Sequence, residues 1–266
     1  LIIDAYQILK PIKEFDKDKI YNNIIEIIDN SKADYIIFAE NNFPYLIDNL
    51  NYLTNLTKDE KKIIFGATRI EEGNFYNSLL LIQKDKINYF DKQILVPFGE
   101  FLPFRKNLNF MEIISGSIDF KSGNNDRVII TNDNLNILPA VCYEIIFNKI
   151  FKNIEKDKID IIINITNDMW FGNKIGPYQH FYLARTKASI ANKPLVRVSN
   201  NGISAIIDNN GKLIRYSKLN QVDNLNYNLK IKDRKNFFTF HKFYFYYLLI
   251  TFIFLIFFGR KKIDEL

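Results

Sequence analysis

The sequence contains a single cysteine, Cys142, in the stretch LPAVCYEII at residues 138–146. An apolar run precedes this cysteine, and Tyr143 and Glu144 follow it, so we expect the thiol where a buried strand ends. A free cysteine has a pKa of about 8.5 and attacks only as the thiolate, so a nucleophilic role requires a nearby base. The alternative is a small buried side chain without chemistry.

Two charged residues also stand at the ends of apolar runs. Glu40 ends ADYIIFAE, and Lys92 follows INYF. In layered α/β proteins, strand ends bring side chains from distant segments to one edge of a sheet. A partly buried Glu40 could then take the thiol proton, while Lys92 and a backbone N–H near Tyr143 stabilise the oxyanion of an attacked carbonyl. The spacing alone leaves open that Glu40 and Lys92 are ordinary surface residues.

Short apolar runs that alternate with helical patterns predict an α/β domain. Ile20, Ile24, Ile27 and Ile28 share one face of a predicted helix, and further helices are expected within 46–60, over about 144–155 and over 176–193. A long loop is expected from 91 to about 125. The predicted strands occupy residues 1–6, 33–40, 62–70, 77–83, 87–90, 127–131, 135–141, 159–166, 194–200, 202–208, 212–217 and 226–231.

Composition is typical of a globular protein. The chain has 266 residues, of which 47% are hydrophobic and 25% charged, and we expect one large domain over residues 1–232. The net charge of +6 comes from lysines scattered along the whole chain. No basic patch with interleaved aromatics stands out, so we expect no nucleic-acid partner. One cysteine excludes an intramolecular disulfide.

The last part of the chain differs in composition. Residues 237–258 read FFTFHKFYFYYLLITFIFLIFF, which predicts one transmembrane helix followed by a short basic-flanked tail at 259–266. A buried core helix is the alternative. Basic residues flank the span on both sides, so charge does not orient it. The opening LIIDAYQILK lacks a signal-peptide pattern, and we expect a fragment or a processed product.

Three motifs, in order along the chain, resemble the Glu–Lys–Cys regions of the carbon–nitrogen hydrolase (nitrilase) superfamily. They are AENNFP around Glu40, DKQILVPFGEFLP around Lys92 and VCYEI around Cys142. Within that superfamily, LVPFGEFLP and NDMWFGNKIGPYQHFYLARTKASIANKPLVRVSNNGISA are similar to the apolipoprotein N-acyltransferase family, and the likeness covers residues 1 to about 258. The resemblance implies a four-layer αββα sandwich followed by one C-terminal membrane helix.

The same resemblance implies roles for individual residues. Glu40 would be the general base, Lys92 the cation that stabilises the oxyanion, and Cys142 the nucleophile. Residues implied to support them are Glu100, Tyr143 and Glu144, and those expected to bind substrate are Trp170, Phe98 and Phe101. Phe104 and Met111 would also suit acyl chains, with loop packing as the alternative. We expect His180 to form a structural hydrogen bond, and Asn167 and Asp168 to serve as turn and cap residues.

The implied reaction is a ping-pong acyl transfer in lipoprotein maturation. Cys142 would take an acyl chain from a phospholipid as a thioester and pass it to the N-terminal amine of a diacylglyceryl-cysteine apolipoprotein. The resemblance implies no metal or cofactor, a monomer, and a catalytic domain that faces the periplasm from the bacterial inner membrane.

The sequence departs from that family in two ways. Several membrane helices expected before the catalytic domain are not among these 266 residues, and FAE replaces the usual tryptophan–proline–glutamate at Glu40. We therefore expect a piece of a longer protein, half of a split gene, or a decayed copy. The alternatives to acyl transfer are a small-amide or nitrile hydrolase on the same three residues, and an inactive remnant.

Overall fold

The computed structural model describes residues 1–9, 16–57, 60–84, 86–105, 118–231 and 246–254. The chain forms two compact units, Leu1–Ile231 and Lys232–Leu266. All of the residues expected to carry chemistry belong to Leu1–Ile231, and among them Met111 lies outside the described residues.

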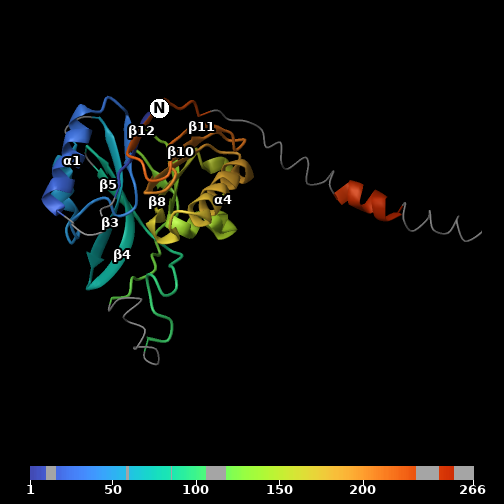
Figure 1. Cartoon of the computed structure of the whole chain (residues 1–266), viewed down its shortest axis with the longest axis horizontal. Helices are drawn as coiled ribbons and strands as arrows, with labels where there is room; N and C mark the ends of the chain where they lie inside the picture. Colours follow the sequence, from blue (N-terminus) through green and yellow to red (C-terminus); the bar gives the residue numbers. More distant parts are fainter. Residues whose placement is uncertain (10–15, 58–59, 85, 106–117, 232–245, 255–266) are drawn as a thin grey trace, which may run out of the picture. The chain divides into compact units, whose positions relative to one another are not determined.

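The first sheet of the larger unit has six strands in the order β12-β1-β2-β3-β4-β5 (Figure 1). Its three neighbouring strands β1, β2 and β3 run parallel, and the remaining pairs are antiparallel. The helix α1 (Lys17–Asn30) connects β1 to β2, as a parallel pair requires. The strands are β1 (Ile2–Gln7), β2 (Tyr35–Phe38), β3 (Lys62–Glu71), β4 (Asn74–Gln83), β5 (Lys86–Asp91) and β12 (Asp223–Asn228).

The second sheet repeats this plan with the order β11-β10-β9-β8-β7-β6. Here β7, β8 and β9 run parallel, and the helix α4 (Ile175–Ala191) lies between β8 and β9 in the sequence. The strands are β6 (Ile129–Ile130), β7 (Asn136–Val141), β8 (Ile161–Asn167), β9 (Leu195–Asn200), β10 (Ala205–Ile207) and β11 (Leu213–Tyr216).

Apolar side chains from both sheets meet in one central cluster, which includes Ile37 of the first sheet and Ile163 of the second. A separate cluster packs Ile24 and Ile28 of α1 on the outer face of the first sheet, and another packs α4 on the outer face of the second. The inner strands β2, β8 and β9 are buried on both faces, which explains their near-continuous apolar runs. This arrangement is the expected αββα sandwich, with α1 and α4 on opposite sides in Figure 1.

The helix expected within 46–60 is present as the short 3-10 helix η1 (Leu50–Leu56). Two other expectations about local structure were wrong. Residues 144–155 hold two 3-10 turns, η3 (Cys142–Ile146) and η4 (Asn148–Phe151), in place of one continuous helix. Phe147 between these turns has extended backbone angles, φ −90° and ψ 137°, which prevents a continuous helix. The strand expected over 33–40 ends at Phe38, so Glu40 lies in the turn that follows.

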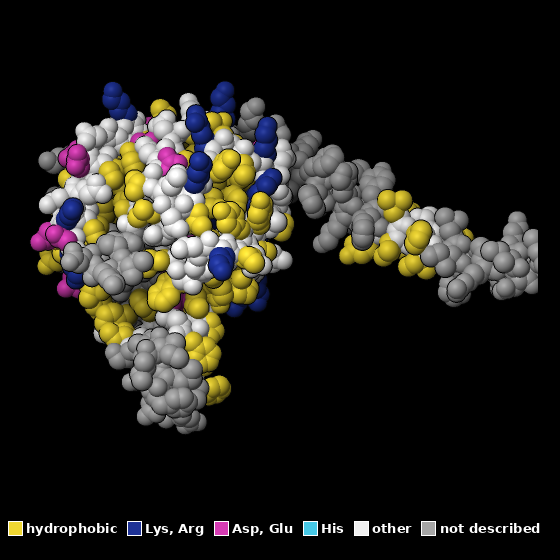
Figure 2. Space-filling model, in the orientation of Figure 1, with side chains coloured by type: hydrophobic (Ala, Val, Ile, Leu, Met, Phe, Trp, Pro, Cys, Tyr) yellow, Lys and Arg dark blue, Asp and Glu magenta, His cyan; other side chains and the backbone are white. Residues whose placement is uncertain are grey.

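In the second unit, residues 246–254 are helical, and their large apolar side chains are 44–74% exposed. These side chains appear as a yellow group in Figure 2. Within the described residues, no helix has both the length and the apolar character needed to span a membrane. The span expected over 237–258 includes 237–245 and 255–258, which lie outside the described residues.

Candidate active site

Three strand ends bring Glu40, Lys92 and Cys142 together. Glu40 follows β2, Lys92 follows β5 directly, and Cys142 follows β7 directly. Their side chains are buried, since the residues are 5%, 1% and 7% exposed. The Lys92 Nζ lies 3.9 Å from Glu40 Oε1, and the Cys142 thiol is close enough to both residues to influence the pKa of each. The three residues therefore meet at one place, as their positions at strand ends predicted.

Glu100 and Asn77 also belong to this site. We call the four residues Glu40, Lys92, Glu100 and Asn77 the front cluster. The Lys92 Nζ donates to Glu100 Oε1 at 2.9 Å and lies 2.8 Å from Oε2. The amide of Asn77, on β4, lies 2.7 Å from an oxygen of each glutamate. The backbone N–H of Val96 also donates to Glu100 at 2.8 Å. Two carboxylates thus share one lysine out of contact with water.

The front cluster shifts the proton affinities of its members. Burial raises the pKa of Glu40, and the negative charge of Glu100 raises it further against the opposing effect of Lys92. Burial lowers the pKa of Lys92, but the charges of Glu40, Cys142 and Glu100 outweigh this and leave the pKa raised. Lys92 is therefore a permanent cation, and Glu40 is a stronger base than an exposed glutamate.

Cys142 has an unusual backbone conformation for a residue with a side chain. Its φ is +56°, in the left-handed region, and it begins the turn η3. Such strain in a non-glycine residue is concentrated at functional sites. Burial, and secondly the charge of Glu40, raise the pKa of the thiol to about 12. At neutral pH the sulfur is therefore protonated, so an attack by this sulfur would require a base, and the Glu40 carboxyl group is close enough to raise its pKa.

Glu144 fixes the Cys142 turn to the segment after Lys92. Its side chain is fully buried, and Oε2 accepts from the Val141 N–H at 2.9 Å. Its other oxygen accepts from the backbone N–H groups of Gln93 and Ile94 at 2.9 and 3.0 Å, and from Arg127 Nη2 at 2.9 Å. One carboxylate therefore sets the position of Cys142 relative to Lys92.

Tyr143 lies between these two segments. Its hydroxyl donates to the Leu95 carbonyl at 3.3 Å, and its ring centroid lies 5.8 Å from Lys92 Nζ, within the range of a cation–π contact. The residue next to Cys142 thus helps to hold the lysine of the front cluster.

A second charged group, the rear cluster, comprises Asp168, Arg197, His180 and Asn164. Arg197 Nη2 donates to both Asp168 oxygens at 2.7 and 3.0 Å, and His180 Nδ1 lies 2.8 Å from Asp168 Oδ1. Arg197 also donates to Asn164 Oδ1, and the Asn164 amide donates to the Cys142 carbonyl at 3.2 Å. The rear cluster therefore supports the backbone of the strained cysteine.

The rear cluster corrects the expectation for Asp168. Although burial raises the pKa of Asp168, Arg197 and His180 together hold it well below its usual range, so it is a buried ion-pair partner and not a turn residue. Burial and the charge of Arg197 lower the pKa of His180. Asn167 does cap η6 (Asp168–Phe171) by accepting from Met169 N, and its own N–H donates to Glu40 Oε2 at 2.7 Å.

Two glycines permit close backbone packing beside the two clusters. A Cβ at Gly66 would lie 2.6 Å from Glu40 Cα and 2.5 Å from Asn41 N. A Cβ at Gly202 would collide with Asp168 Oδ2 and with the Ser199 hydroxyl. A larger residue at either position would displace a charged group of the site.

The aromatic residues expected to bind substrate lie on the segments that carry the clusters. Trp170, in η6, is 80% exposed, and Phe98, four residues beyond Ile94, is 43% exposed with φ +64°. Phe101 is half-buried next to Glu100, and Phe104 is 80% exposed. These side chains are presented to solvent and remain candidates for an acyl-chain contact.

Sequence reasoning missed Asn77, Asn164, Arg127 and Arg197. Arg197 carried a signal, because a charged residue inside the apolar run PLVRVSN needs a buried partner. Asn164 carried a weaker signal of the same kind inside β8. Asn77 and Arg127 begin apolar runs and gave none. Their partners come from other segments, which local patterns do not reveal.

The family model for carbon-nitrogen hydrolases matches residues 5–223. An apolipoprotein N-acyltransferase of Rickettsia typhi is 35% identical over 225 residues, and one of Wigglesworthia glossinidia brevipalpis is 38% identical over 237 residues. These alignments cover 79% and 84% of the chain but only 45% of each relative. The chain therefore spans less than half the length of these curated relatives.

Solved structures share the fold at low identity. A CN-hydrolase superfamily protein of Xanthomonas campestris, solved with an arsenic adduct in its active site, has a TM-score of 0.63 and 16% identity, over 85% of this chain and 89% of that one. The glutamine-dependent NAD⁺ synthetase of Acinetobacter baumannii has a TM-score of 0.65 and 19% identity, over 84% of this chain and 44% of that one. With the family model matched over most of its length, the chain belongs to the carbon-nitrogen hydrolase family.

Proposed function

We propose that this chain is the catalytic part of an N-acyltransferase that moves an acyl chain from a phospholipid to the N-terminal amine of a diacylglyceryl-cysteine apolipoprotein. The observation that carries the proposal is the buried group formed by Glu40, Lys92 and Cys142. The named relatives, which are apolipoprotein N-acyltransferases, support this substrate class over others.

In the first half-reaction, Glu40 takes the proton of the Cys142 thiol as the sulfur attacks the ester carbonyl of the phospholipid. The charge that develops on the carbonyl oxygen is stabilised by Lys92, which stays protonated beside Glu100. When the tetrahedral intermediate collapses, the alkoxide of the lysophospholipid leaves and takes the proton from Glu40. The product is a thioester on Cys142.

In the second half-reaction, the α-amine of the apolipoprotein attacks the thioester carbonyl. Glu40 accepts a proton from the attacking amine and returns it to the departing sulfur of Cys142, so that an amide forms and the thiol is regenerated. No electron transfer is needed in either step. Burial of the group excludes water, which would otherwise compete with the amine for the thioester.

Membrane attachment belongs to the same proposal. Residues 1–232 form the catalytic domain, residues 237–258 span the bacterial inner membrane, and 259–266 form a short tail, with the catalytic domain on the periplasmic side. The exposed apolar side chains within 246–254 support this arrangement. Trp170, Phe98 and Phe101 would contact acyl chains, and the enzyme would act as a monomer.

Intact-protein mass spectrometry tests the proposal. The detergent-solubilised chain is incubated with phospholipid, alongside Cys142→Ala. We expect an added acyl mass on the wild-type chain that hydroxylamine removes, and no adduct on the variant, because only the sulfur can form the thioester. A folded wild-type chain that never acquires the mass, also when tested within a longer version of the protein, would contradict the proposal.

The alternative of small-amide or nitrile hydrolysis uses the same three residues with water as the acceptor. The same sample separates the two functions when a diacylated peptide amine is added. Transfer of the acyl mass to the peptide supports the acyltransferase, whereas release of free fatty acid with an unmodified peptide supports a hydrolase.

A further inference from the structure

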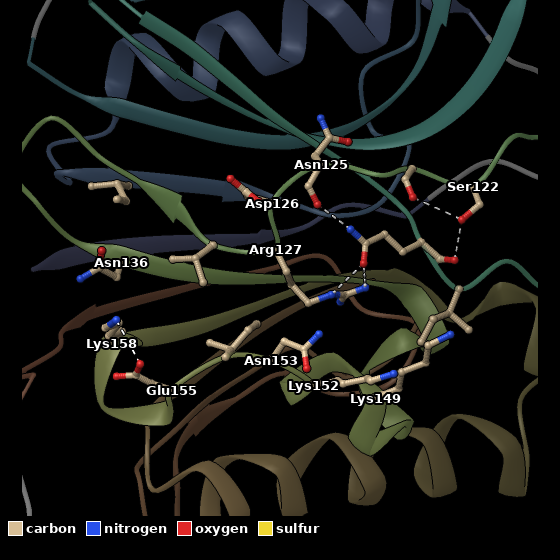
Figure 3. Close-up of a pocket in the computed structure, with 16 residues that line it drawn as sticks. Ser122, Asn125, Asp126, Arg127, Asn136, Lys149, Lys152, Asn153, Glu155 and Lys158 are labelled. Carbon is tan, nitrogen blue, oxygen red and sulfur yellow. Dashed lines mark hydrogen bonds and ion pairs between the residues drawn. The ribbon is translucent and has the colours of Figure 1, made fainter.

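A cavity of about 860 Å³ lies beside the catalytic group but contains none of its three residues. We call it the trough. Figure 3 shows Asn125 and Arg127 above Lys149 and Lys152, which line its opposite sides. The trough therefore runs between the segment that leads into β6 and the turn η4 with the residues that follow it.

The charge of the trough is predominantly positive. Its lining includes Arg127, Lys149, Lys152 and Lys158, and only two acidic residues. One of these, Glu155, pairs with Lys158 at 3.2 Å. Lys149 and Lys152 take part in no ion pair within the chain that the structure describes. Two lysines are therefore available to an anion that enters from solvent.

Arg127 adds a donor that the protein does not use. Its side chain is 8% exposed, and its Nε and Nη2 atoms donate to Gln93 Oε1 while Nη2 also donates to Glu144. The Nη1 atom has no hydrogen-bond partner among the described residues, nor does Asn125 Oδ1. Buried polar groups of this kind are rarely left unpaired, and both atoms are closed off from solvent as the side chains stand. A bound group that accepts and donates hydrogen bonds would pair with them by drawing the side chains toward the trough.

A phosphate group that carries a proton or a neighbouring hydroxyl meets these requirements. Its oxygens accept from a guanidinium and from ammonium groups, and its hydroxyl can donate to an amide oxygen. A simple apolar ligand would leave all four polar groups unsatisfied. The size of the trough also exceeds what a single inorganic ion requires, so a phosphoester fits the space.

We propose that the trough binds a phosphate-bearing ligand through Arg127, Lys149 and Lys152, and that binding changes the reactivity of Cys142. The connection is Glu144, because the same Glu144 oxygen accepts from Arg127 and from the N–H groups after Lys92, while its other oxygen holds Val141 next to the nucleophile. A ligand that draws Arg127 toward the trough alters this shared carboxylate.

Equilibrium dialysis of the detergent-solubilised chain with radiolabelled inorganic phosphate tests the binding. The variant Lys149→Gln/Lys152→Gln should bind about tenfold more weakly, because it loses two charge-assisted hydrogen bonds. The matched control Lys32→Gln/Lys86→Gln removes the same charge from exposed sites elsewhere and should bind like the wild type. Equal affinity in all three proteins, or no saturable binding in the millimolar range, would overturn the proposal.

Competition identifies the source of the phosphate. Displacement of the label by glycerol 3-phosphate alone supports a soluble phosphoester. Displacement by phosphatidylglycerol vesicles that is lost in Lys149→Gln/Lys152→Gln and kept in the control variant supports a lipid headgroup. The Cys142→Ala chain should bind phosphate normally, so failure of acyl transfer and failure of this site remain distinguishable.

The link to the nucleophile has its own measurement. The rate at which methyl methanethiosulfonate modifies Cys142 in the wild type should change at least twofold, in either direction, at saturating phosphate. The variant Lys149→Gln/Lys152→Gln should need about tenfold more phosphate for the same relative change. An unchanged rate in the wild type at saturation would overturn the connection through Glu144.

Discussion

The front and rear clusters lie on either side of Cys142 and differ in how their charges are balanced. The front cluster has two carboxylates, Glu40 and Glu100, for one lysine. The rear cluster has one carboxylate, Asp168, which receives hydrogen bonds from an arginine and contacts a histidine. Both are almost completely buried. Burial alone therefore does not distinguish them.

The difference appears in the proton affinities. Burial raises the pKa of both carboxyl groups. The pKa of Glu40 stays raised because Glu40 shares its cation with a second negative charge, whereas Arg197 and His180 outweigh burial at Asp168 and leave its pKa lowered. A carboxylate whose proton affinity is raised can take a proton from a thiol, whereas one with a depressed pKa stays ionised and serves as structure. This difference supports the proposal that the front cluster carries the chemistry and the rear cluster supports its structure.

The largest expected effect comes from Glu40→Gln. We expect the acylation of Cys142 to slow by about 10²–10⁴, the range that general-base catalysis contributes. Rapid-quench mass spectrometry with a phospholipid donor measures the rate. The control Glu26→Gln, on the exposed side of α1, should acylate normally. A rate for Glu40→Gln within a factor of about ten of the control would assign the base to another group.

The next effect concerns stability. Arg197→Met should lower the free energy of unfolding by about 3–5 kcal/mol, because it leaves Asp168 buried without its cation. Urea denaturation at neutral pH measures this loss, with the exposed Arg215→Met as control. Adding Asp168→Asn should recover part of it. If Arg197→Met and Arg215→Met unfold at the same urea concentration, the rear cluster is not structural.

The contribution of Asp168 to the free energy of unfolding should also depend on pH. Because the folded pKa of Asp168 is depressed, its contribution to stability is fully present above the ordinary aspartate pKa of about 3.9 and is lost as pH falls through the folded value. The wild-type and Asp168→Asn proteins should therefore converge in stability as the solution is made strongly acidic. A difference that stays constant down to low pH would show that Asp168 acts through packing alone.

The smallest effect tests the charge on Glu100. Because that charge raises the pKa of Glu40, Glu100→Gln should move the acidic limb of the acylation pH profile to lower pH. The base would then be ionised over a wider pH range but would be weaker, so the plateau rate should fall. A limb that stays in place would mean that burial alone sets the proton affinity of Glu40.

The sequence predicted the parts of the site that depend on local patterns. Glu40, Lys92 and Cys142 each follow an apolar run, and the strand ends do bring them together. The helix α1 was predicted from its apolar face, of which Ile24 and Ile28 are fully or nearly buried. These features depend on periodicity, which a sequence displays directly.

Pairings between distant segments could not be predicted in this way. Glu144 accepts hydrogen bonds from residues about 50 positions earlier in the sequence. Glu144 itself lies in a 3-10 turn, where the sequence of residues 144–155 suggested a helix. The Asn77 amide joins Glu40 to Glu100 from a strand that was predicted, but nothing in the sequence marked Asn77 itself as part of the site. Tertiary contacts outweigh local propensity at such places.

The close packing at Gly66 and Gly202 has an evolutionary consequence. A gene copy released from selection would accept alanine or serine at either position as readily as at any other glycine codon. In a working copy, the added carbon would press on Glu40 at one position and on Asp168 at the other. If related sequences keep both glycines while the surrounding loops vary, this conservation would indicate selection on the site. It would do so independently of Cys142.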